Sequence, residues 1–165
     1  MLCLPHLQDL TTGELRRLVR DLAAQPELWE HLIRHDPSER TYEQLLLDEH
    51  VGVYLICWMD GHDTGFHDHD VSAAAIAVAH GQVREDRLSI GAEPASCLLG
   101  PGDVLDVEPA DIHRVRHAGR LPAVTIHAYS PPLARMGSYE VSPSGRLRRH
   151  AMPSSEELRP VAASG

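Results

Sequence analysis

The stretch GHDTGFHDH (residues 61–69) contains the spacing Gly-x5-His-x-His, which ends on His67 and His69. In a β-strand, residues two apart point to the same face, so both imidazoles can reach the interior of a β-barrel. Two adjacent buried imidazoles are costly unless something satisfies them, and a divalent metal does so. The same spacing also fits two surface histidines near a turn. The stretch therefore predicts a strand and a candidate metal site.

The sequence downstream extends this pattern. Gly-x5-His-x-His-x4-Glu-x6-Gly is the first cupin motif; here Gly81 stands at the closing glycine, and Ala74 replaces the glutamate. The second cupin motif has a glycine, a proline and a histidine, and Gly102, Pro109 and His113 follow that order with a spacing that differs by one residue. The chain thus resembles the cupins. This resemblance implies an all-β, double-stranded β-helix (jelly-roll) barrel with His113 as a third metal ligand.

The loss of the glutamate bears on the chemistry of such a site. Three neutral imidazoles leave a ferrous ion with its full double positive charge, whereas a carboxylate ligand would partly cancel it. We expect a more positive, open centre to favour an anionic thiolate ligand and to leave room for O2.

Short segments rich in β-branched and aliphatic residues follow one another from about residue 40. They are separated by turn residues, and their regular spacing is typical of a sandwich or barrel. The predicted strands are Val53–Cys57, Ala73–Ala79, Val83–Leu88, Val104–Val107, Ile112–His117 and Ala123–Tyr129.

Two helices are predicted before these strands, within residues 10–36. Thr11 and Glu14 have the spacing of a capping box at the start of the first helix. Pro26 suits the first turn of the second. Apolar residues repeat at helical spacing in both: Leu15, Leu18, Val19 and Leu22, then Leu28, Trp29, Leu32 and Ile33. We expect a single domain over residues 1–152 and a mobile tail over residues 153–165.

The last predicted strand holds three polar residues that alternate along it. Thr125, His127 and Tyr129 share one face, while Val124 and Ile126 share the other. A row of this kind beside a metal could hydrogen-bond in sequence and deliver the Tyr129 hydroxyl to the metal's ligands. A buried tyrosine satisfied by a neighbouring histidine would give the same pattern.

These motifs together resemble the cysteine dioxygenase family of thiol dioxygenases. The matching segments are HDH (67–69), IHRV (112–115) and TIHAYSPP (125–132), within a resemblance that covers about residues 40–135. The resemblance implies an Fe(2+) ion on the three histidines and a relay through Thr125, His127 and Tyr129. It also implies that a small thiol and O2 react to give a sulfinic acid.

The chain departs from the mammalian members at the substrate residues. A cysteine that cross-links to the relay tyrosine is replaced by Ala74, so no Cys–Tyr cross-link is expected. The substrate-binding arginine of a Tyr-x-Arg segment is replaced by Gln44, after Tyr42, as in a bacterial branch associated with 3-mercaptopropionate. That branch has another arginine after the relay tyrosine, for which Arg135 is the candidate. Cysteine, 3-mercaptopropionate and a thione such as ergothioneine all remain open as substrates.

The composition limits partners and location. A net charge of −9, from 24 acidic and 15 basic residues, argues against binding nucleic acid or an anionic membrane. Three cysteines without a CxxC spacing argue against a disulfide framework. With no predicted signal or membrane segment, we expect a cytoplasmic monomer or small homo-oligomer.

Two other functions fit the same residues. One is a cupin metalloenzyme that acts on a non-sulfur substrate, and the other is a non-catalytic cupin that binds a small molecule. Fold alone does not separate these from a thiol dioxygenase. The alternating Thr–His–Tyr residues favour the dioxygenase.

Overall fold

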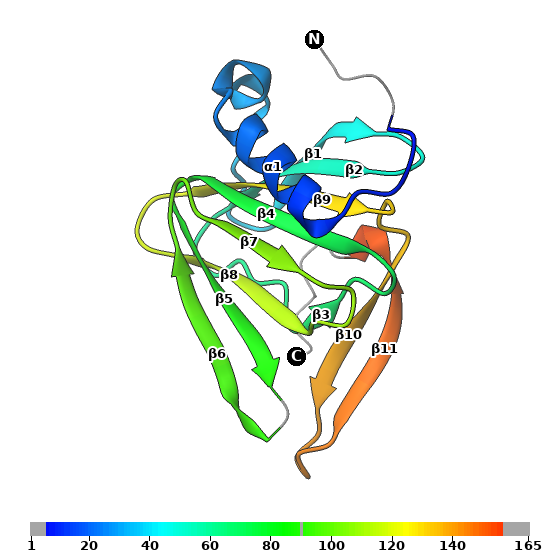
Figure 1. The fold of residues 1–165 in the computed structure, drawn as a ribbon. Helices are drawn as coiled ribbons and strands as arrows, with labels where there is room; N and C mark the ends of the chain where they lie inside the picture. Colours follow the sequence, from blue (N-terminus) through cyan, green and yellow to red (C-terminus); the bar gives the residue numbers. More distant parts are fainter. Residues whose placement is uncertain (1–5, 90, 157–165) are drawn as a thin grey trace.

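The computed structural model describes residues 6–89 and 91–156, which form two antiparallel sheets and one α-helix (Figure 1). One sheet has the strand order β1 (Thr41–Leu47), β2 (Gly52–Trp58), β9 (Ala123–Ser130), β4 (Ala73–His80), β7 (Val104–Val107). The other has the order β11 (Leu147–Pro153), β10 (Arg135–Val141), β3 (His67–Asp68), β8 (His113–Ala118), β5 (Gln82–Ser89), β6 (Ala92–Leu99). The predicted all-β architecture is confirmed.

The central strands β2, β9 and β4 of the five-stranded sheet are buried on both faces. In β2, Ile56 and Trp58 face the second sheet and join an interior core, whereas Val53 and Leu55 face outward and join a second core under the helix. Every residue of β9 is buried for the same reason. Because the interior face of β9 is enclosed, its polar residues lie away from bulk water.

Helix α1 (Thr12–Ala23) covers the outer face of this sheet and packs on β4, β9 and β7 (Figure 1). Thr11 and Glu14 form the predicted capping box, which satisfies backbone donors at the helix start. Leu15 and Val19 are fully buried against the sheet. The described helices contain no segment that is long and apolar enough to cross a membrane.

The prediction of a second α-helix is wrong. Residues 26–32 form two 3-10 turns, Pro26–Leu28 and Glu30–Leu32, separated by Trp29. Trp29 has φ −140°, which is not helical, and its Nε1 donates to the Leu22 carbonyl at 2.9 Å. The indole is 1% exposed, so burying it beneath α1 is favoured over continuing a helix.

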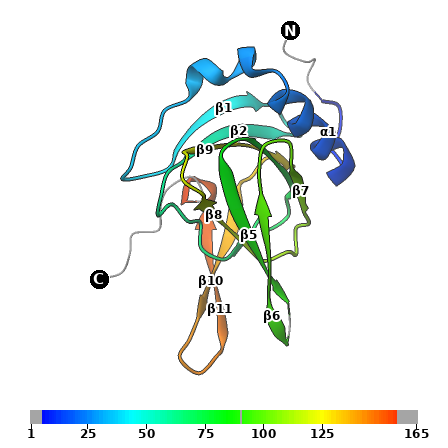
Figure 2. The same ribbon diagram turned by 90° about the vertical axis from the view of Figure 1, so that its left-hand side faces the viewer.

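Each of the six predicted strands overlaps an observed one, but β1, β6, β10 and β11 were not predicted. Most of β6 and β11 is exposed, so these strands lack the apolar alternation of a half-buried strand. Figure 2 shows the β5–β6 and β10–β11 hairpins extending away from the sheet that carries α1. Most of the predicted mobile tail, residues 157–165, lies outside the described residues.

Gly81 occupies the tight turn between β4 and β5. Its φ is +65°, and a Cβ at this position would lie 2.5 Å from the Pro122 carbonyl oxygen. A side chain would thus be excluded by both conformation and contact. This accounts for the glycine that closes the first cupin motif.

Asp48 fixes the turn between β1 and β2. Its carboxylate accepts the backbone N–H groups of His50 and Val51 at 2.8 and 2.9 Å, and it lies 2.7 Å from Nδ1 of His6. Burial alone would raise the pKa of Asp48, but these hydrogen bonds lower it well below its ordinary value. The carboxylate therefore stabilises the hairpin in its ionised form.

We predict that Asp48 makes the protein sensitive to acid. Because the folded-state pKa is lowered, its stabilisation is present above the unfolded value of about 3.9 and is lost as the pH falls towards the folded value. Asp48→Asn should lower the free energy of unfolding by about 1–2 kcal/mol at neutral pH and flatten its dependence between about pH 5 and pH 3. Urea denaturation at several pH values measures both. Asp21→Asn, at an exposed carboxylate, is the control; equal effects of the two variants would contradict the prediction.

Candidate metal centre and adjoining side chains

Three histidines converge between the two sheets. His67 lies on β3, His69 follows directly after this strand, and His113 begins β8 in register with His67. One ring nitrogen from each lies within 4.8 Å of the others, and all three residues are at most 1% exposed. The predicted convergence of the three imidazoles is therefore present in the fold.

The ring nitrogens are oriented for a shared cation. Nδ1 of His67 lies 3.0 Å from the Gly65 carbonyl oxygen, and Nδ1 of His113 lies 3.0 Å from Oε1 of Glu85. Since both neighbours are acceptors, each Nδ1 carries the proton and leaves a lone pair on Nε2. The Nε2 atoms of His67 and His69 are only 3.2 Å apart, a distance at which two lone pairs repel unless a proton or cation lies between them. Three neutral imidazoles fit a divalent iron, zinc, copper or nickel ion.

Asp68, between the two histidines, points away from the centre and anchors β3. It accepts hydrogen bonds from Arg149, from the Tyr139 hydroxyl and from the Gly137 backbone N–H. Burial opposes its ionisation, but the hydrogen bonds from Arg149 and Tyr139 hold the pKa of Asp68 well below its ordinary value. A strand of only two residues is thereby fixed to the β10–β11 hairpin, which keeps His67 and His69 in place.

The predicted Thr–His–Tyr row is hydrogen-bonded along β9. Thr125 Oγ1 lies 2.8 Å from His127 Nε2, and His127 Nδ1 lies 3.0 Å from the Tyr129 hydroxyl. Thr125 and Tyr129 are fully buried, and His127 is 2% exposed.

Trp58 donates a hydrogen bond to the first residue of this row. Its Nε1 lies 2.8 Å from Thr125 Oγ1 and can only donate. The Thr125 hydroxyl accepts from Trp58 and has one hydrogen of its own to donate; when that hydrogen goes to Nε2 of His127, the imidazole carries its proton on Nδ1 and donates to the Tyr129 oxygen. In this arrangement the hydroxyl hydrogen of Tyr129 is directed to a different acceptor.

The row reaches the three histidines through Tyr129. The ring centroids of Tyr129 and His69 are 5.2 Å apart in an edge-on arrangement. Ala74 lies opposite Tyr129 on the neighbouring strand β4. The phenol is thus held between the row and the candidate metal centre.

The three predicted substrate residues, Gln44, Tyr42 and Arg135, do not lie in one place. Gln44 is in register with Tyr54 on β2, and Tyr42 is in register with Ile56, so both lie on the side of β1 that continues the interior face of β2, where both are exposed. The ring of Tyr54, the register partner of Gln44, lies 6.2 Å from that of Tyr129. The Arg135 side chain is 75% exposed, and its Nε lies 3.7 Å from Asp70, so the structure does not bring it to this group.

Sequence reasoning missed two charged residues. Arg40 immediately precedes β1 and is 3% exposed, with its guanidinium carbon 5.1 Å from the centre of the Trp58 ring. Arg40, Tyr42 and Gln44 are two residues apart, so an extended strand places them on one side; this spacing was the sequence signal that could have identified Arg40. Glu85 contacts His113 across two strands, and no local pattern marks such a contact.

Comparisons with known proteins identify relatives of this chain. The sequence profile described as cysteine dioxygenase type I matches residues 7–101. Cysteine dioxygenase type 1 from Danio rerio is 26% identical over 145 residues, covering 80% of this chain and 71% of that protein. The protein of the same name from Homo sapiens is 22% identical over 136 residues, covering 75% and 67%.

Solved structures agree on the fold. A cupin superfamily protein from Desulfitobacterium hafniense matches with a TM-score of 0.53 and 17% identity, over 62% of this chain and 87% of that one. A protein with a double-stranded β-helix domain from Klebsiella pneumoniae matches with a TM-score of 0.55 and 18% identity, over 62% and 80%. At these identities the likeness concerns the fold, and it confirms the predicted cupin barrel.

Proposed function

Because this chain belongs to the cysteine dioxygenase type I family, we propose that it is an iron-dependent thiol dioxygenase. The reaction is RSH + O2 → RSO2H, in which sulfur is oxidised to a sulfinic acid and both oxygen atoms are incorporated. The observation that carries this proposal is the hydrogen-bonded row ending on Tyr129, whose ring contacts His69 beside the three-histidine centre.

His67, His69 and His113 would hold the ferrous ion, which supplies the place where the thiolate and O2 meet. No carboxylate of the first cupin motif joins them, because Ala74 stands at that position. The centre therefore keeps a net positive charge that favours binding of the thiol in its deprotonated form. Burial of all three imidazoles keeps water away and strengthens this attraction.

Tyr129 is the proposed hydrogen-bond donor to the reacting oxygen or the substrate. His127 holds the phenol oxygen through Nδ1–H, and Thr125 and Trp58 fix the imidazole in that tautomer. Ala74 has no sulfur, so we propose that Tyr129 works without a thioether cross-link.

The interior side of β1 favours a small thiol that bears a carboxylate. Gln44 offers hydrogen bonds without charge, and the buried guanidinium of Arg40 makes the region more positive. Among the candidates, 3-mercaptopropionate and cysteine fit this environment better than cysteamine, which is cationic. The Arg135 side chain is largely exposed beside Asp70 and has no part in this proposal.

O2 consumption by the iron-loaded protein tests the function. The panel comprises cysteine, 3-mercaptopropionate, cysteamine and ergothioneine, with mass spectrometric detection of the sulfinic acids. We expect oxidation of at least one carboxylate-bearing thiol and weaker oxidation of cysteamine. If the loaded protein consumes no O2 with any member of the panel, the proposal fails, and a cupin acting on another substrate or binding a ligand takes its place.

A further inference from the structure

Glu85 is a buried carboxylate that contacts one of the three histidines. Its Oε1 lies 3.0 Å from Nδ1 of His113, and its side chain is 10% exposed. Glu85 and Arg87 alternate along β5, and Arg87 is in register with His113 on β8. The contact therefore follows from strand pairing rather than from a mobile surface side chain.

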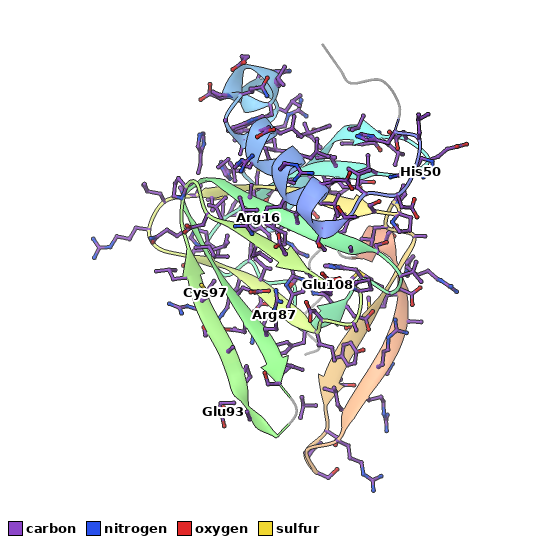
Figure 3. All side chains as sticks on the ribbon, viewed as in Figure 1. Arg16, His50, Arg87, Glu93, Cys97 and Glu108 are labelled. Carbon is purple, nitrogen blue, oxygen red and sulfur yellow. The ribbon has the colours of Figure 1, made fainter. Side chains whose placement is uncertain are left out.

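Arg87 forms an ion pair with the carboxylate and holds it in place. Its Nη2 and Nε lie 2.7 and 3.2 Å from the same oxygen of Glu85 that faces His113. Arg87 also donates to Asp111 and to the backbone carbonyl of Asp106, at 3.0 and 2.8 Å. Figure 3 labels Arg87 at the end of β5 and Glu108 in the loop between β7 and β8.

The same contacts fix the loop that leads into His113. Asp111 accepts the Glu108 backbone N–H at 2.8 Å, and the Leu88 N–H donates to the Ile112 carbonyl at 2.9 Å. The carboxylate, the guanidinium and the loop thus form one continuous set of contacts that ends on the His113 imidazole.

We propose that Glu85 is a positioning residue that orients His113 and strengthens it as a metal ligand. A carboxylate hydrogen-bonded to a ligating imidazole fixes the ring and increases the basicity of the nitrogen that faces the metal. This carboxylate lies one hydrogen bond outside the three imidazoles. A position next to the metal then stays open for substrate. This inference rests on the metal centre of the proposed function.

Metal affinity is the direct readout. Glu85→Gln retains an oxygen that can accept from Nδ1 of His113 but removes the charge. We expect the dissociation constant for Fe(II), measured without oxygen against a chromophoric chelator, to rise about 10- to 100-fold. We also expect the Fe(III)/Fe(II) midpoint potential to rise, because removal of a nearby negative charge disfavours the ferric state more than the ferrous state.

Asp86→Asn is the matched control. Asp86 is the next residue of β5, is 7% exposed and pairs with Arg116 at 3.1 Å, so this variant removes a buried charge from the same strand without touching His113. It should leave the Fe(II) affinity and the potential unchanged. Circular dichroism melting of the metal-free proteins establishes that each variant is folded.

Glu85→Asp keeps the charge but withdraws it by one methylene group. Its Fe(II) affinity should fall between those of the wild type and Glu85→Gln, and it provides a second test if Glu85→Gln does not fold. Wild-type affinity in either folded Glu85 variant, or an equal loss in Asp86→Asn, would overturn the inference while leaving the proposed function standing. A wild-type protein that takes up no iron would defeat both.

Discussion

Under the proposed function, replacing His113 with alanine should abolish iron binding and reduce thiol oxidation to the level of the metal-free protein. His113 is fully buried at the start of β8 and supplies one of three converging nitrogens. A centre with two imidazoles has lost a third of its protein ligands, and ligand loss weakens metal binding directly. Iron content by elemental analysis and sulfinic acid production are measured on the same preparation.

His117→Ala is the control for this prediction. His117 lies on the same strand, but it is partly exposed, and its Nε2 lies 2.8 Å from the Leu121 carbonyl oxygen. This variant should retain both iron and activity. Full iron content in His113→Ala, with unchanged product formation, would show that the three nitrogens are not the metal site.

Replacing Tyr129 with phenylalanine should leave iron binding intact and lower kcat by about 10²- to 10⁴-fold, the range typical of a positioned proton donor. The ring remains in its buried position, so the packing against His69 is retained while the hydroxyl is lost. Steady-state O2 consumption with the preferred thiol measures kcat and KM separately.

Thr125→Val provides a graded comparison. It removes the acceptor of Trp58 and the donor to His127 but keeps the Tyr129 hydroxyl, so the loss in kcat should be smaller. The dependence of kcat on pH should also change in this variant, because the tautomer of His127 is no longer fixed. A kcat unchanged in Tyr129→Phe would assign the row a purely structural role.

The arrangement of the main site residues was predictable because it depends on the spacing of residues along single strands. The His-x-His spacing at residues 67–69 predicted two imidazoles on one side of a strand, and the alternation of Thr125, His127 and Tyr129 predicted a row on one side of another. Both arrangements occur in the structure. Period-two patterns survive folding because strand geometry alone determines which residues share a side.

The remaining features depend on contacts between distant segments. The apolar spacing of residues 28–33 fits a helix, but burial of Trp29 beneath α1 overrides it. The contact between Glu85 and His113 arises only when β5 pairs with β8. The period of two that relates Arg40 to Tyr42 marks it in the sequence, but only the fold places its guanidinium over Trp58.

Oxidation of the preferred thiol under ¹⁸O2 tests the central claim most directly, with Tyr129→Phe and His113→Ala run in parallel. The account predicts that the wild-type protein gives a sulfinic acid in which both oxygen atoms carry the label. It predicts slow formation of the same product by Tyr129→Phe and none above background by His113→Ala. A product whose oxygen comes from water, or equal product formation by His113→Ala, would contradict it.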